Sequence, residues 1–114
     1  MNNHYKKEKI MSTTEQNLAD AFAGESQANR KYLAFAKQAE RDGYPQAAKL
    51  FRAAAAAETV HAHAHLRAMG GIRSTKENLV EAMAGETHEF ENMYPDMIKT
   101  AEAEEHKSPR TMPV

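Results

Sequence analysis

Residues 17–26 read NLADAFAGES and residues 78–87 read NLVEAMAGET, and six of the ten aligned positions are identical. These stretches are 61 residues apart, whereas AERDG at 39–43 and AEAEE at 101–105 correspond at an offset of 62. One extra residue has therefore entered the second copy, which predicts a single-residue bulge in a helix between these points. A general alanine-rich helix bias is the alternative explanation, but an internal repeat accounts better for the match around Gly-Glu.

Each repeated stretch lies near the start of a long helical pattern. Helix start signals precede three segments, and stop signals follow the first two. The starts are Ser12-x-x-Glu15 or Thr13-x-x-Gln16, Pro45, and Ser74-x-x-Glu77, and the stops are Gly43 and Gly70-Gly71. Pro95 falls inside the third segment, where it should remove a hydrogen bond and bend the helix. Because short linkers favour antiparallel neighbours, the sequence predicts an all-α antiparallel bundle with three long helices.

Length and composition narrow the class of protein. The 114 residues suit one small domain, predicted over residues 12–107 between a flexible extension at 1–11 and a frayed tail at 108–114. The absence of cysteine excludes disulfides and thiolate-bound iron. A formal net charge of −1 favours neither nucleic acid nor a membrane surface as a partner, and no apolar run approaches a membrane span. The N-terminus does not resemble a secretory signal, so we expect a cytoplasmic protein.

The repeat also predicts an element that this chain lacks. Its unit is a helical hairpin, so a complete second copy would contain a fourth helix that mirrors residues 50–66. The same offset would place a second Glu-x-x-His motif at about positions 120 and 123, beyond the last residue, Val114. A four-helix bundle would therefore be completed by another chain.

Residues three or four apart along a helix form a stripe on one of its sides, and in each predicted helix one such stripe should face the bundle core. Four residues that can bind metals fall on these stripes: Glu25, Glu58, His61 and Glu86. An unpaired buried carboxylate costs several kcal/mol, and no Lys or Arg shares these stripes. Glu58 and His61 are three residues apart, so both point toward one spot. One Glu from each of two helices and a Glu-x-x-His from each of the other two is the ligand plan of carboxylate-bridged di-metal bundles. Such donors suit iron, manganese or zinc.

The individual motifs are weaker than their combination. A lone Glu-x-x-His on a helix is more often solvated than metal-bound, and Glu25 alone would more often be a surface residue. The arrangement on predicted core faces, related by a repeat, favours the metal site. His65, one turn beyond His61, is expected to be a neighbour of the site or simply buried rather than a ligand, and His63 is expected to be solvated.

The motifs resemble those of the rubrerythrin family. The similar stretches are GESQANRKY at 24–32, ETVHAHAHLRAMGG at 58–71 and NLVEAMAGETHEFENMYP at 78–95, and the likeness covers about residues 14–106. The resemblance implies a ferritin-like four-helix bundle with a non-haem di-iron centre that reduces hydrogen peroxide to water.

The resemblance also implies roles for individual residues. The iron ligands would be Glu25, Glu58, His61, Glu86 and Glu89, with Glu58 and Glu86 bridging the two irons. One iron would move between His61 and Glu89 as the redox state changes, which makes these two the candidate catalytic residues. Two tyrosines, Tyr32 and Tyr94, would hydrogen-bond to ligand carboxylates and orient them.

This chain departs from the family pattern in two ways. The cysteine-bearing rubredoxin domain is absent, so electrons would come from a separate, rubredoxin-like donor protein. The fourth helix is absent too, and three explanations stay open. Two chains could pair as a homodimer, with or without domain swapping, and supply Glu25, Glu58 and His61 twice. The natural gene product could be longer, this chain being truncated. The chain could instead bind metal poorly.

Two functions follow from these alternatives. The first is a di-iron peroxidase that depends on an external electron donor. The second is a non-catalytic helical module that binds iron or oligomerises through an incomplete metal site.

Overall fold

The computed structural model describes residues 12–104. The predicted extension at 1–11 and the predicted tail at 108–114 lie outside the described residues. Every regular element within 12–104 is helical, so the predicted all-α class is confirmed. The chain divides into two compact units, and the division falls between Ile72 and Arg73.

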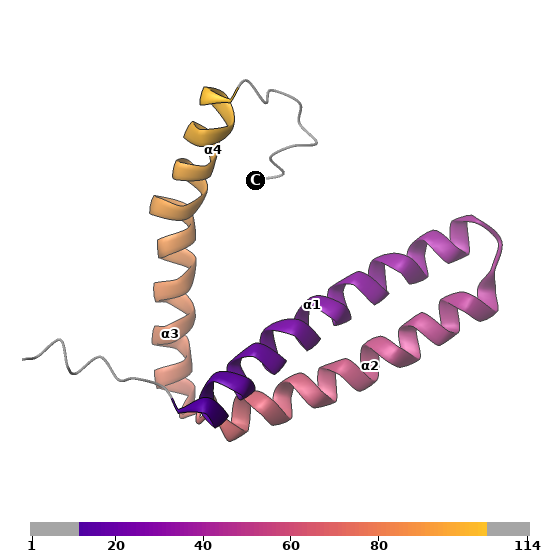
Figure 1. Ribbon diagram of the computed structural model, residues 1–114, viewed down its shortest axis with the longest axis horizontal. Coiled ribbons are helices and arrows are strands. Elements are labelled where there is room, and N and C mark those ends of the chain that lie inside the picture. Colours follow the sequence, from indigo (N-terminus) through magenta and orange to yellow (C-terminus); the bar gives the residue numbers. More distant parts are fainter. Residues whose placement is uncertain (1–11, 105–114) are drawn as a thin grey trace, which may run out of the picture. The chain divides into compact units, whose positions relative to one another are not determined.

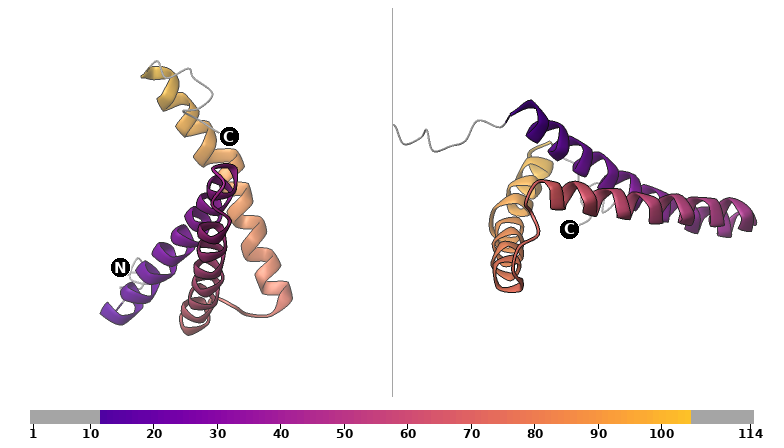
Figure 2. Two further views of the ribbon diagram at one scale, coloured as in Figure 1. Left: turned by 90° about the vertical axis from the view of Figure 1, so that its right-hand side faces the viewer. Right: turned by 90° about the horizontal axis from the view of Figure 1, so that it is seen from below.

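The first unit is a hairpin of two long helices, α1 (Thr13–Arg41) and α2 (Pro45–Ala68). Figure 1 shows them running antiparallel, side by side, and the views in Figure 2 agree. The 29 residues of α1 correspond to about 43 Å of helix at 1.5 Å per residue. Both helices were predicted, and their antiparallel order follows from the short linker between them.

The predicted start and stop signals set the helix ends. Of the two candidate caps for α1, the structure uses Ser12: its hydroxyl accepts from the Glu15 backbone N–H, and the Glu15 carboxylate accepts from the Ser12 backbone N–H. Gly43 follows α1 with a φ of 85°, a left-handed conformation that glycine adopts without steric cost. Pro45 occupies the first turn of α2, where its missing N–H leaves no hydrogen bond unmade.

The core of the hairpin consists of alanine. Ala48, Ala55 and Ala62 are the buried residues of α2, and they lie seven residues apart along its contact with α1. Such small side chains allow two helices to approach closely. The sequence instead predicted that Glu58 and His61 face the core, but the observed contact line passes through Ala62, the residue after His61. The prediction differs from the structure because alanines occupy the contact between α1 and α2. Glu58 and His61 therefore lie at the edge of this contact.

The second unit is a helical rod made of α3 (Thr75–His88), η2 (Glu89–Met93) and α4 (Tyr94–Ala103). Its start is the predicted capping box of Ser74 with Glu77. The middle segment η2 is a π-helix, in which the Tyr94 N–H donates to the carbonyl of Glu89, five residues back. A π-helix accommodates one extra residue within a helix, so the bulge predicted from the shift in repeat offset is confirmed.

Pro95 lies at the beginning of α4 rather than inside an α-helix. It nevertheless lies within the helical rod of α3, η2 and α4, as predicted, just after the π-helix. The predicted bend at Pro95 stays a prediction. A first-turn proline leaves fewer backbone groups unpaired than an interior one.

Several large apolar side chains of the second unit are exposed, among them Leu79, Met83, Phe90 and Met97, whereas Ala101 is buried. A single helical rod cannot cover its own apolar face. None of the described helices is both long and apolar enough to be a candidate membrane span.

Candidate metal centre

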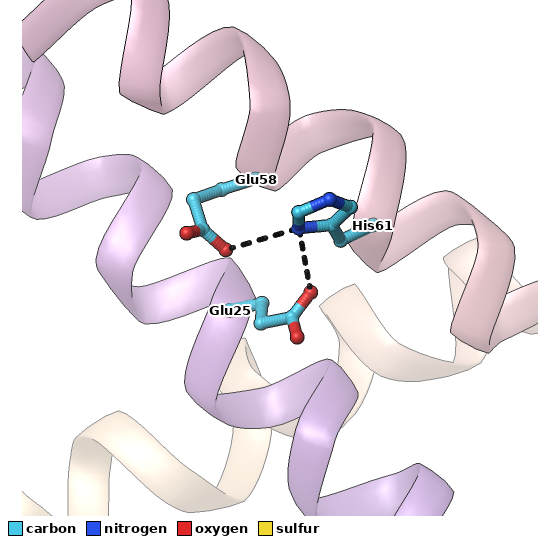
Figure 3. Close-up of side chains that lie close together, drawn as sticks. All are labelled: Glu25, Glu58 and His61. Atoms are coloured by element: carbon cyan, nitrogen blue, oxygen red, sulfur yellow. Dashed lines mark ion pairs between the residues drawn. The ribbon is translucent and has the colours of Figure 1, made fainter.

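Glu25 of α1 meets Glu58 and His61 of α2 between the two helices of the hairpin (Figure 3). The Nδ1 atom of His61 lies 3.6 Å from Oε1 of Glu25 and 3.9 Å from Oε1 of Glu58. Glu58 and His61 share one side of α2 because they are three residues apart. The structure therefore brings together three of the five predicted metal ligands.

Burial differs among the three side chains. Glu58 is 22% exposed and Glu25 is 31% exposed, so both carboxylates are largely withdrawn from solvent. His61 is 57% exposed, so the expectation that it points into the core is not met within the hairpin. It lies at the rim because its neighbour Ala62 occupies the helix contact.

One oxygen of Glu25 has no hydrogen bond within the described residues, and its contact with Nδ1 of His61 is 3.6 Å long. Oε1 is buried, and no hydrogen-bond donor within the described residues reaches it. Leaving a buried charged acceptor unsatisfied is costly. A cation between Glu25, Glu58 and His61 would remove this cost, so the geometry fits a metal ligand better than a plain surface carboxylate.

The spacing of the three donor atoms suits one divalent ion. They all lie within 4.8 Å of one another. Two donors on opposite sides of an ion with bonds of about 2.1 Å are about 4.2 Å apart, so the side chains need to close by well under an ångström. Two carboxylate oxygens and one imidazole nitrogen are donors that iron, manganese and zinc all accept.

His65 contacts the other oxygen of Glu25. Its Nε2 lies 3.2 Å from Glu25 Oε2, and the His65 side chain is 28% exposed. Because a carboxylate oxygen in this contact accepts, Nε2 carries the hydrogen. The expectation that His65 is a neighbour of the site is confirmed.

Asn29 is a residue of the site that the sequence reasoning missed. It is only 7% exposed, and its Nδ2 donates across the hairpin to the carbonyl of Ala55 and to Oγ1 of Thr59, both at 2.7 Å. Asn29 lies one turn after Glu25, and Thr59 directly follows Glu58. These bonds therefore fix the register of α1 against α2 where the two carboxylates meet. The sequence did contain a signal: Asn29 lies four residues after Glu25, on the side of the helix that carries apolar residues and candidate ligands.

The two predicted tyrosines have different settings. Tyr32 belongs to an aromatic cluster, with its ring centroid 6.3 Å from those of both Phe35 and Phe51. No hydrogen bond joins its hydroxyl to a carboxylate within residues 12–104, so its role in orienting a ligand stays a prediction. Tyr94 is the first residue of α4 and is half-buried.

The remaining predicted ligands lie on the second unit. Glu86 is in α3 and is exposed, and Glu89 is the first residue of the π-helix and is half-buried. The π-helix changes the direction in which side chains after it point relative to those before it. The metal-binding roles of Glu86 and Glu89 stay predictions.

His63 is exposed, as expected. It lines a hollow of about 330 Å³ between α1 and α2, together with Asn29, Thr59 and Leu66 among others. None of the three clustered residues lines this hollow. His63 is therefore a histidine of the same helix that lies outside the cluster of Glu25, Glu58 and His61.

Comparisons with known proteins support one family. A family model described as Rubrerythrin matches residues 16–112. The chain is 40% identical over 109 residues to a rubrerythrin of Porphyromonas gingivalis, a match that covers 84% of this chain and 54% of the relative. It is 37% identical over 106 residues to a rubrerythrin of Nitratidesulfovibrio vulgaris (82% and 56%) and 36% identical over 108 residues to nigerythrin of the same organism (82% and 54%). The chain thus spans about half the length of these curated relatives.

Proposed function

The chain belongs to the rubrerythrin family, and on that premise we propose that it is a non-haem di-iron oxidoreductase that reduces hydrogen peroxide to water. The observation that carries the proposal is the cluster of Glu25, Glu58 and His61. Its buried carboxylate oxygen, which accepts no hydrogen bond within the described residues, and its two-oxygen, one-nitrogen donor set both suit iron. Glu86 and Glu89 are the proposed additional ligands, and manganese or zinc could bind the same donors.

Bound iron would supply the two electrons that, with two protons, convert one peroxide into two waters. The chain itself contributes charge and position. Glu25 and Glu58 provide negative charge that is largely shielded from water, which strengthens their attraction to a divalent cation. Asn29 holds the two helices that carry them in register.

His61 is placed to tolerate movement. Its side chain is more than half exposed, and the buried position next to it is filled by Ala62. The imidazole can therefore move without disturbing the alanine core. This supports the proposal that His61 and Glu89 alternate as ligands when the redox state changes.

The electrons are proposed to come from a thiolate-bound iron centre that lies outside these 114 residues. The given sequence contains no cysteine, and cysteine thiolates hold the iron that commonly relays electrons. A rubredoxin-like donor is the proposed partner.

A second copy of the chain is proposed to complete the di-metal site. The hairpin offers three ligands, whereas the four-helix ligand plan uses six. Two hairpins related by a twofold axis would supply Glu25, Glu58 and His61 twice, because a symmetric interface presents the same residues from both sides. Solution mass measured together with metal content tests this: a metal-bound dimer supports it, and a metal-free monomer contradicts it.

The peroxidase proposal is tested anaerobically. The protein is loaded with ferrous iron, one equivalent of peroxide per two irons is added, and diferric absorbance is followed together with peroxide loss. Stoichiometric oxidation in the wild type, lost in Glu58→Ala and retained in His63→Ala, is the expected result. Iron that binds but is not oxidised by peroxide would eliminate the peroxidase function.

The alternative function is a non-catalytic iron-binding or oligomerising module. It is favoured by the fact that the hairpin alone holds only three ligands. Under this alternative, iron binds at Glu25, Glu58 and His61 but peroxide is not consumed, so the same experiment separates the two functions.

A further inference from the structure

The two oxygens of Glu25 have different surroundings. Oε2 lies 3.2 Å from Nε2 of His65, whereas Oε1 is buried and lies 3.6 Å from Nδ1 of His61, with no hydrogen-bond donor to it within residues 12–104. The two histidines are four residues apart, so they follow one another along one side of α2. One imidazole therefore faces each oxygen of the carboxylate.

We infer that His65 is a positioning residue: its Nε2–H holds Oε2 and leaves Oε1 as the single oxygen that Glu25 offers to a metal. This inference rests on the proposed metal site but not on peroxidase activity. A carboxylate without such a partner can bind through either oxygen or through both, and it must lose rotational freedom when a metal arrives. A hydrogen bond already made before binding removes much of that loss.

Direct ligation by His65 fits the geometry less well. The ligand atoms of Glu25, Glu58 and His61 lie within 4.8 Å of one another, and His65 is not a member of that group. Its Nε2 forms a hydrogen bond with Oε2 of Glu25. The other oxygen, Oε1, is the one that has no hydrogen-bond donor within the described residues. Groups that hold a metal ligand in this way typically change metal affinity 10- to 100-fold when removed.

The test measures cobalt affinity of the full chain by calorimetry, without peroxide. His65→Leu removes the donor and should weaken cobalt binding about 10- to 100-fold. His65→Gln keeps an amide N–H close to the position of Nε2 and should restore most of the affinity. His63→Leu is the matched control, because His63 is an exposed histidine of the same helix outside the cluster, and it should bind cobalt as the wild type does.

A second pair keeps the test decisive if His65→Leu disturbs folding, which circular dichroism of each apoprotein would show. His65→Asn is one methylene shorter than His65→Gln and should not reach Glu25, so the Asn variant should lose affinity where the Gln variant retains it. Equal affinities of these two polar variants would overturn the inference.

Ligand counting by X-ray absorption provides the readout that separates positioning from ligation. We expect the same number of imidazoles per cobalt in the wild type and in His65→Leu. Loss of one imidazole in the variant would overturn the inference, because His65 would then be a ligand. Unchanged affinity in His65→Leu, or a wild type that binds no cobalt, would overturn it as well. Tight cobalt binding with the expected variant pattern, in a protein that leaves peroxide untouched, would reject the proposed peroxidase function and retain the role of His65.

Discussion

Replacing Asn29 with alanine should destabilise the hairpin by about 1.5 kcal/mol. The substitution removes two hydrogen bonds between α1 and α2, to the carbonyl of Ala55 and to Oγ1 of Thr59. Each is worth about 1 kcal/mol net, and the better helix propensity of alanine offsets roughly 0.5 kcal/mol of the loss. The acceptors are not left fully unpaired, because Thr59 Oγ1 also donates to the Ala55 carbonyl at 3.2 Å.

The assay is urea unfolding followed by circular dichroism, with Asn17→Ala as the matched control. Asn17 lies exposed on the same helix, so its replacement brings the same gain in propensity without loss of a bond across the hairpin. We expect the control to be as stable as the wild type or slightly more so. A double-mutant cycle with Thr59→Ala should give a coupling energy of about 1 kcal/mol. If Asn29→Ala matches Asn17→Ala in stability, the proposed lock between the helices is wrong.

Three further predictions follow from single residues. Glu58→Ala should reduce bound iron to background in elemental analysis, because it removes the least exposed of the three clustered side chains; unchanged iron content would reject the ligand assignment. Hydrogen bonds from the backbone N–H and the hydroxyl of Ser74 lower the pKa of Glu77 below its ordinary 4.5. The capping box should therefore contribute stability above about pH 4.5 and lose it as the pH falls through the lowered pKa, and Glu77→Gln should lack this part of the acid dependence in a pH series of urea unfolding. Gly43→Ala should lower the free energy of unfolding of the hairpin by about 1–2 kcal/mol because the φ of Gly43 is 85°. Gly24→Ala, inside α1 with open space around it, should raise the free energy of unfolding by about 1 kcal/mol. The same sign for both glycines in urea unfolding would contradict the backbone argument.

Local signals in the sequence predicted the helix boundaries well. Capping boxes, a first-turn proline and left-handed glycines act over only a few residues, so they can be read without knowing what the helix packs against. The π-helix was predictable for a different reason. A repeat with an offset that changes from 61 to 62 residues must accommodate one residue inside a helix, and the structure does so at Glu89–Met93.

Packing was less predictable, because it depends on which neighbour covers each face. The sequence predicted that Glu58 and His61 lie on the side of α2 that faces Glu25, and in the structure both side chains are close to Glu25. The residues of α2 that are buried against α1, however, are Ala55 and Ala62. Consecutive side chains on a helix point in directions about 100° apart. His61 and the buried Ala62 are consecutive, and periodicity alone did not show which of the two faces α1. The role of Asn29 was missed because its partners come from another helix, 26 and 30 residues further along the chain.

We propose that Glu25, Glu58 and His61 bind iron, and a crystal structure of the iron-loaded protein would show whether they do. With anomalous diffraction recorded at the iron absorption edge, we expect an iron peak about 2.1 Å from Oε1 of Glu25, a carboxylate oxygen of Glu58 and Nδ1 of His61. Iron bound elsewhere, or a fully loaded protein with no peak between these three side chains, would contradict it.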